Sequence, residues 1–174
     1  MQNRTLRQLT AAGVIAAAYA ALSLVLATIT FGPVQCRISE ALTLLPVISP
    51  AAIWGVTLGC AVTNGVGAAT GTNFLGLVDL LVGTAATLLA AVATRLLGKI
   101  RFGGLPWLSA LPPILINAVA IGGEWCYAMT GSINGAFWVF AGQIALGQLP
   151  PCLLGVWLVG LLERRSLQTI IEGK

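Results

Sequence analysis

The chain alternates between long apolar stretches and short connections that contain glycine, proline or charged residues. The apolar stretches cover residues 9–30, 38–48, 51–69, 74–97, 105–128 and 134–161. All except 38–48 hold about the 20 residues that an α-helix needs to cross a hydrocarbon core, whereas 38–48 would cover roughly half of that thickness. The pattern predicts an all-α fold, an integral membrane bundle whose long helices cross the bilayer.

The basic residues favour a crossing by the short stretch as well. Eight of the nine form three groups between the stretches, at Arg4 and Arg7, at Arg95, Lys99 and Arg101, and at Arg164, Arg165 and Lys174. Because basic connections stay on the cytoplasmic side, all three groups are expected there. An even number of crossings must then separate Arg7 from Arg95, so 38–48 has to cross with its neighbours. We predict six transmembrane helices with both termini cytoplasmic, in a single domain over residues 1–174.

Composition agrees with this class and excludes others. Hydrophobic residues make up 57% of the chain and charged residues 8%, whereas about a quarter of a soluble domain is charged. The net charge of +4 is explained by residues that flank helices, so nucleic-acid binding is not expected. The predicted location is the cell (plasma) membrane, as a multi-pass protein.

Three acidic residues interrupt the apolar stretches, and the predicted topology places all of them in the outer half of the bilayer. They are Glu40, Asp79 and Glu124. An ionisable group inside a membrane is costly and marks a functional site by default. Asp79 and Glu124 have no basic residue within helical reach, whereas Arg37 and Glu40 are three residues apart and could form an interfacial ion pair. We expect these acids to line a cavity that opens outward.

Further polar and aromatic residues lie at similar depth. Asn64, Asn117 and Gln143 could contact a ligand or join helices by hydrogen bonds. Aromatic residues at helix ends could form an interfacial belt or the walls of a pocket. The candidate ligand-binding residues are Arg37, Glu40, Asn64, Asp79, Asn117, Glu124, Trp125, Tyr127, Trp138 and Gln143.

Small residues repeat along one face of the first helix. Ala12, Ala16 and Ala20 are spaced by four, and small residues on one face let another helix approach closely. We predict a docking face for a partner at these positions. The spacing alone leaves open whether that partner is an internal helix or another protein.

Catalytic and metal chemistry are not expected. The chain has no histidine, and Cys36, Cys60, Cys126 and Cys152 form no C-x-x-C pair, so a metal site or a Cys/His nucleophile is improbable. No glycine-rich phosphate loop is present, so the chain is not expected to hydrolyse ATP itself. Cys36 and Cys126 could approach each other near the outer surface, or pack as buried thiols.

Three segments carry a resemblance to a known family. They are FGPVQCRISEALTLLP at residues 31–46, AAIWG at 51–55 and VDLLVGTAATLLAA at 78–91. Together they resemble the QueT-type queuosine-precursor transporters, which are substrate-binding S components of energy-coupling factor (ECF) transporters. The likeness extends over nearly the whole chain. Gly147-Gln148 stands where the family pattern has Gly-Glu.

The resemblance implies six helices with cytoplasmic termini and a 7-deazaguanine cargo such as preQ1, preQ0 or queuine. It also implies a transmembrane coupling protein and two cytoplasmic ATPases, which use ATP while this chain carries no cofactor. A guanine-like edge offers N–H donors to carboxylates, and an aminomethyl group would add a cation that needs a second carboxylate. Which of the acids takes which role stays open.

The sequence therefore predicts a substrate-binding S component for vitamin-like uptake, and not an enzyme. One alternative is an S component for another small planar metabolite. The other is a self-sufficient secondary carrier. That carrier would need a carboxylate reachable from the cytoplasm, and the inner half of the chain offers none apart from Glu163 among the terminal charges.

Overall fold

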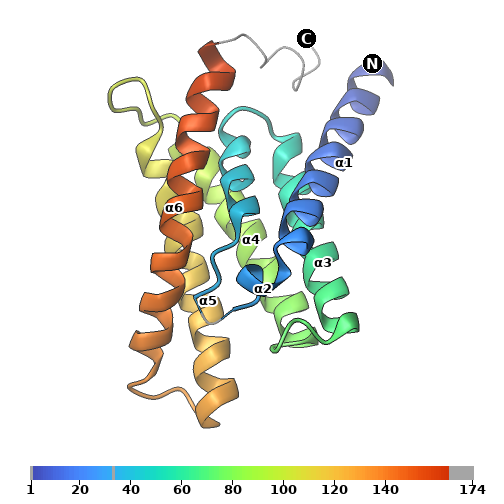
Figure 1. Cartoon of the computed structure of the whole chain (residues 1–174). Helices are drawn as coiled ribbons and strands as arrows, with labels where there is room; N and C mark the ends of the chain where they lie inside the picture. Colours follow the sequence, from blue (N-terminus) through green and yellow to red (C-terminus); the bar gives the residue numbers. More distant parts are fainter. Residues whose placement is uncertain (1, 33, 165–174) are drawn as a thin grey trace.

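The computed structural model describes residues 2–32 and 34–164 and shows a bundle of helices (Figure 1). The long helices are α1 (Gln2–Val25), α3 (Ala51–Thr70), α4 (Leu77–Leu97), α5 (Leu111–Thr130) and α6 (Phe137–Arg164). Shorter elements are α2 (Ala27–Thr30) and the 3-10 helices η1 (Ile38–Val47) and η2 (Trp107–Ala110). In this part of the chain the β pairing amounts to one isolated bridge, between Phe102 and Leu105. The predicted all-α class is confirmed.

Five helical segments of the described chain are long and apolar enough to cross a membrane. The stretch predicted at 9–30 is divided at Leu26 into α1 and α2, and the stretch at 105–128 is divided into η2 and α5. Residues 38–48 form the short η1 rather than a full-length α-helix. The count of six crossings and the cytoplasmic termini therefore stay predictions.

The segments that carry the basic groups lie together at one end of the bundle (Figure 1). Figure 1 shows that α1 begins and α6 ends at the same end of the bundle, where the connection from α4 to η2 also lies. In that connection Arg101 forms a bidentate pair with Glu163, with nitrogen–oxygen distances of 2.5 and 2.7 Å. The hydrogen bonds that Arg101 donates to the Glu163 carboxylate raise the pKa of Arg101. Arg165 and Lys174 lie outside the described residues.

The long helices pack in the order α1, α3, α4, α5, α6, each against the next. η1 contacts α6, α4, α1 and α3, so it fills the interior that these helices surround. Its Leu44, with Val56 of α3 and Val156 of α6, belongs to the main apolar core. The short η1 is thus the element that the other helices enclose.

Glycines on α6 let this helix lie close to η1 and to the segment before it. A Cβ atom at Gly155 would lie 2.5 Å from the carbonyl oxygen of Ala41, and one at Gly147 would collide with the carbonyl oxygen of Val34. In both places the backbone of α6 touches the backbone of η1 or of the segment before it. A methyl group there has no flexible side chain to displace.

We expect Gly147→Ala to lower the free energy of unfolding by about 1–3 kcal/mol, because overpacking forces backbone to move. Gly142→Ala on the same helix is the matched control, since a Cβ atom there meets nothing within 4 Å. Thermal unfolding of both variants in detergent, followed by tryptophan fluorescence, checks this. Equal stability of the two variants would contradict the tight contact.

The alanine stripe predicted as a partner-docking face lies against α3. Ala12 and Ala20 are buried and Ala16 is partly buried. Cβ atoms at Gly55 and Gly59 of α3 would each lie 3.0 Å from a carbonyl oxygen of α1, those of Ala12 and Ala16 respectively. The stripe therefore meets an internal helix, which is one of the possibilities that its spacing left open. The small residues that α1 exposes are Gly13, Ala17, Ala18 and Ala21.

Candidate ligand-binding site

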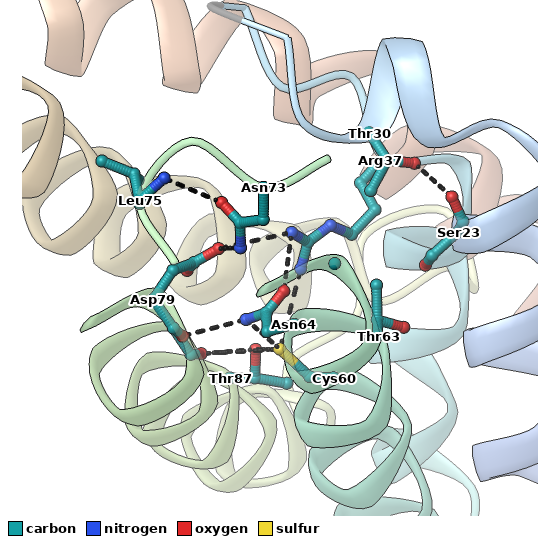
Figure 2. A network of polar contacts seen from close by, with 12 residues as sticks. Ser23, Thr30, Arg37, Cys60, Thr63, Asn64, Asn73, Leu75, Asp79 and Thr87 are labelled. Atoms are coloured by element: carbon teal, nitrogen blue, oxygen red, sulfur yellow. Dashed lines mark hydrogen bonds and ion pairs between the residues drawn. The ribbon is translucent and has the colours of Figure 1, made fainter. Parts of the chain in front are cut away.

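A buried polar network surrounds Arg37, between α3 and α4 (Figure 2). The Arg37 side chain donates to Oδ1 of Asn64 at 3.1 Å and contacts Sγ of Cys60 at 3.7 Å. Its Nη2 lies 4.0 Å from Oδ2 of Asp79. Its guanidinium carbon lies 5.6 Å from the centre of the Phe31 ring. Arg37, for which we considered an interfacial ion pair with Glu40, is therefore only 5% exposed and contacts residues of α3 and α4 inside the bundle.

Asp79 accepts hydrogen bonds at both its side chain and its backbone carbonyl. Asn73 donates to its Oδ2 at 2.8 Å, and Asn64 donates to its backbone carbonyl at 2.9 Å. A Cβ atom at Gly83, one turn along α4, would collide with its Oδ1. No basic residue of the sequence lies within helical reach of Asp79, but Arg37 reaches it from a distant segment. Asp79 is therefore part of an ion pair.

Glu40 has a different partner from the one that its spacing suggested. Its Oε1 accepts a hydrogen bond from the Tyr19 hydroxyl at 2.6 Å, and no ion pair with Arg37 forms within 4.0 Å. Its Oε2 is buried without a hydrogen-bond partner. The neighbouring hydroxyls of Ser39 and Ser23 lie 2.6 Å apart. Glu40 thus joins η1 to α1.

Glu124 lines a pocket between α4 and α5, at the end of the bundle opposite to the basic connections. The pocket has a volume of about 410 Å³ and is lined by Phe74, Leu75, Val78, Gly123, Glu124, Tyr127, Ala128 and Ile133. Both carboxylate oxygens of Glu124 are buried and have no hydrogen-bond partner in the described chain. The lining is otherwise mostly apolar. The pocket therefore presents one carboxyl group among apolar walls.

Aromatic rings stack beside this pocket. The rings of Phe74 and Trp125 lie 5.5 Å apart at an interplanar angle of 18°, and Phe140 continues the stack at 6.4 Å from Trp125. Trp125 is buried, and its Nε1 has no partner in the described chain. Tyr127 lines the pocket with 62% of its surface exposed. Trp138 is 76% exposed, as expected for an aromatic belt.

The predicted residues thus fall into separate groups. Arg37, Asn64 and Asp79 form the network, whereas Glu124 and Tyr127 line the pocket. Trp125 stacks on Phe74, another lining residue. The remaining predicted residues belong to neither group. Asn117 is buried on α5, and Gln143 of α6 has a buried Oε1 without a partner. The structure does not bring Trp138 to either group.

Some partners of the buried acids were not among the predicted binding residues. Tyr19 stands in an apolar helix, and Asn73 stands in a turn where it also accepts from the backbone N–H of Leu75 at 3.1 Å. Gln35 has a φ of 44°, and its buried Nε2 has no partner. A positive φ at a residue other than glycine is uncommon and can mark a functional segment. Cys36, Cys60, Cys126 and Cys152 are all free thiols.

Comparison with known proteins gives one family. No curated protein and no solved structure matches the chain. The family model described as QueT transporter matches residues 9–164. That range contains every helix of the bundle in whole or in large part, and the family is one of transporters and not of enzymes. The chain, a multi-pass helical protein with a polar interior, therefore belongs to the QueT transporter family.

Proposed function

We propose that this protein is the substrate-binding S component of an ECF-type importer and that it binds a queuosine precursor, a 7-deazaguanine. Membership of the QueT transporter family supports a transport role. The observation that carries the binding site is the pocket of about 410 Å³ with the unpartnered Glu124 carboxylate. Small-molecule sites are typically apolar clefts of roughly 300–1,000 Å³ with a few polar groups.

The chemistry of the pocket suits a planar bicyclic base. Phe74 and Tyr127 line it with aromatic surface on which a flat ring could stack. The ring of Phe74 is itself stacked on that of Trp125. Glu124 supplies two acceptor oxygens, and a guanine edge or an amine supplies donors for them. The ligand would enter from outside, because the pocket lies at the end opposite to the basic connections.

The exposed face of α1 supports a partner within the membrane. Gly13, Ala17 and Ala21 repeat every four residues and are exposed, and a Cβ atom at Gly13 meets nothing within 4 Å. Contact with lipid gives no reason for such small residues, whereas close packing against another helix does. The transmembrane coupling protein would dock here, and its cytoplasmic ATPases would drive release of the ligand into the cell.

The test is ligand binding to the detergent-purified chain, measured by calorimetry or fluorescence. We expect saturable binding of 7-aminomethyl-7-deazaguanine and much weaker binding of adenine, whose hydrogen-bonding edge differs. Uptake is then measured in cells with and without the coupling protein and ATPases. Uptake that persists without the ATPases would favour the secondary carrier. A lack of binding by every 7-deazaguanine would overturn the proposed cargo.

A further inference from the structure

We infer that Glu124 makes the pocket selective for a ligand that carries a protonated amine. This inference rests on the proposed function, because it concerns the same cargo class and the same pocket. It adds a requirement to the proposed cargo. The planar ring alone is not sufficient for binding, and one carboxylate recognises the positive charge of the ring's substituent.

The first argument is the lack of a positive partner for Glu124. Its two carboxylate oxygens are buried without hydrogen-bond partners. Neither ion pair in the described part of the chain includes Glu124. A carboxylate whose oxygens are buried without donors is costly, and an ammonium group in the pocket would compensate it.

The second argument is that the other buried acids already have donors. Glu40 accepts a hydrogen bond from the Tyr19 hydroxyl. Asp79 accepts one from the Asn73 amide and lies beside Arg37. The Arg37 guanidinium is engaged with Asn64 and Cys60 as well. Within residues 2–32 and 34–164, Glu124 is therefore the acid of the bundle whose two carboxylate oxygens both lack a hydrogen-bond partner.

The third argument is the surface around the carboxylate. Phe74 and Tyr127 line the same pocket as Glu124. Aromatic faces attract ammonium groups, and the attraction increases where water is excluded. A neutral substituent such as a nitrile would gain neither the ion pair nor this attraction. It would also leave the carboxylate uncompensated.

The experiment compares two ligands that share the 7-deazaguanine ring and differ at one substituent. 7-Aminomethyl-7-deazaguanine is a cation at neutral pH, and 7-cyano-7-deazaguanine is neutral. A hydrogen bond between charged groups contributes enough to predict an affinity ratio of about 10- to 150-fold in favour of the amine for the unaltered protein. The ratio is measured by calorimetry at pH 7.

Variants assign the preference to one residue. Glu124→Gln keeps the shape and removes the charge, so the ratio should fall toward about 1, mainly through weaker binding of the amine. Glu124→Asp keeps the charge on a shorter side chain and should keep part of the ratio. Glu163→Gln makes the same chemical change at the other end of the bundle, where the side chain pairs with Arg101, and should leave the ratio unchanged.

The outcomes separate this inference from the proposed function. Equal affinity for the two ligands in the unaltered protein would overturn the charge requirement and leave the 7-deazaguanine cargo standing. A preference that survives in Glu124→Gln would also overturn the assignment. If neither ligand binds, the proposed function itself fails. The first comparison needs no variant, so it tests the charge requirement even if Glu124→Gln does not fold, and Glu124→Asp then tests the assignment to this residue.

Discussion

Asp79→Asn is expected to lower the free energy of unfolding by about 3–5 kcal/mol, because it leaves the buried Arg37 guanidinium without its counter-charge. The asparagine can still accept from Asn73, so the loss reports the charge rather than the hydrogen bond. Unfolding of the purified protein in a denaturing detergent, followed by tryptophan fluorescence, measures this. The effect should be present without any ligand.

A double-mutant cycle separates the ion pair from the individual residues. Arg37→Gln alone should also destabilise, because Asp79 then lacks its cation. The double variant should lose less than the sum of the single losses, with a coupling energy of about 0.5–3 kcal/mol. Glu163→Gln, which breaks a partly exposed pair, should cost no more than about 1 kcal/mol. Additive losses at Arg37 and Asp79 would show that the two charges do not stabilise each other.

Ala17→Leu is expected to abolish ATP-driven uptake while ligand affinity stays within about a factor of 2 of the unaltered protein. Ala17 is exposed between Gly13 and Ala21 on α1. A leucine there would hold a docked helix away, and lipid would solvate it well when no partner is bound. Uptake in cells, co-purification of the ATPase module and ligand binding are measured on the same variant.

Ala18→Leu is the matched control for this experiment. It makes the same change one residue further along α1, on the exposed side that carries Val14, Leu22 and Val25. Large residues already face outward there, so uptake should continue. Full uptake by Ala17→Leu would show that the small-residue stripe faces lipid only. Loss of ligand binding would show that α1 shapes the pocket.

Hydrophobic patterning predicted the helices because the length of an apolar stretch is a local property. It also identified Glu124, whose isolation from basic residues holds in three dimensions. It could not predict the ion pair of Asp79, because Arg37 comes from a connection whose path depends on the glycines of α6. Residue spacing likewise showed that α1 has small faces, but not that the one at Ala12 and Ala20 packs on α3. Contacts between distant segments were the missing information.

The enclosed position of η1 has a consequence for how the protein is made. A translocon admits helices one at a time as they emerge from the ribosome, and a short segment flanked by Arg37 and containing Glu40 is a poor substrate for that step. The surfaces that shelter it include α4 and α6, and α6 is synthesised last. We therefore expect η1 to reach its final packing only after α6 has been inserted. Until then the side of η1 that α6 covers stays open, although Tyr19 of α1 and Asp79 of α4 are already available to pair with Glu40 and Arg37.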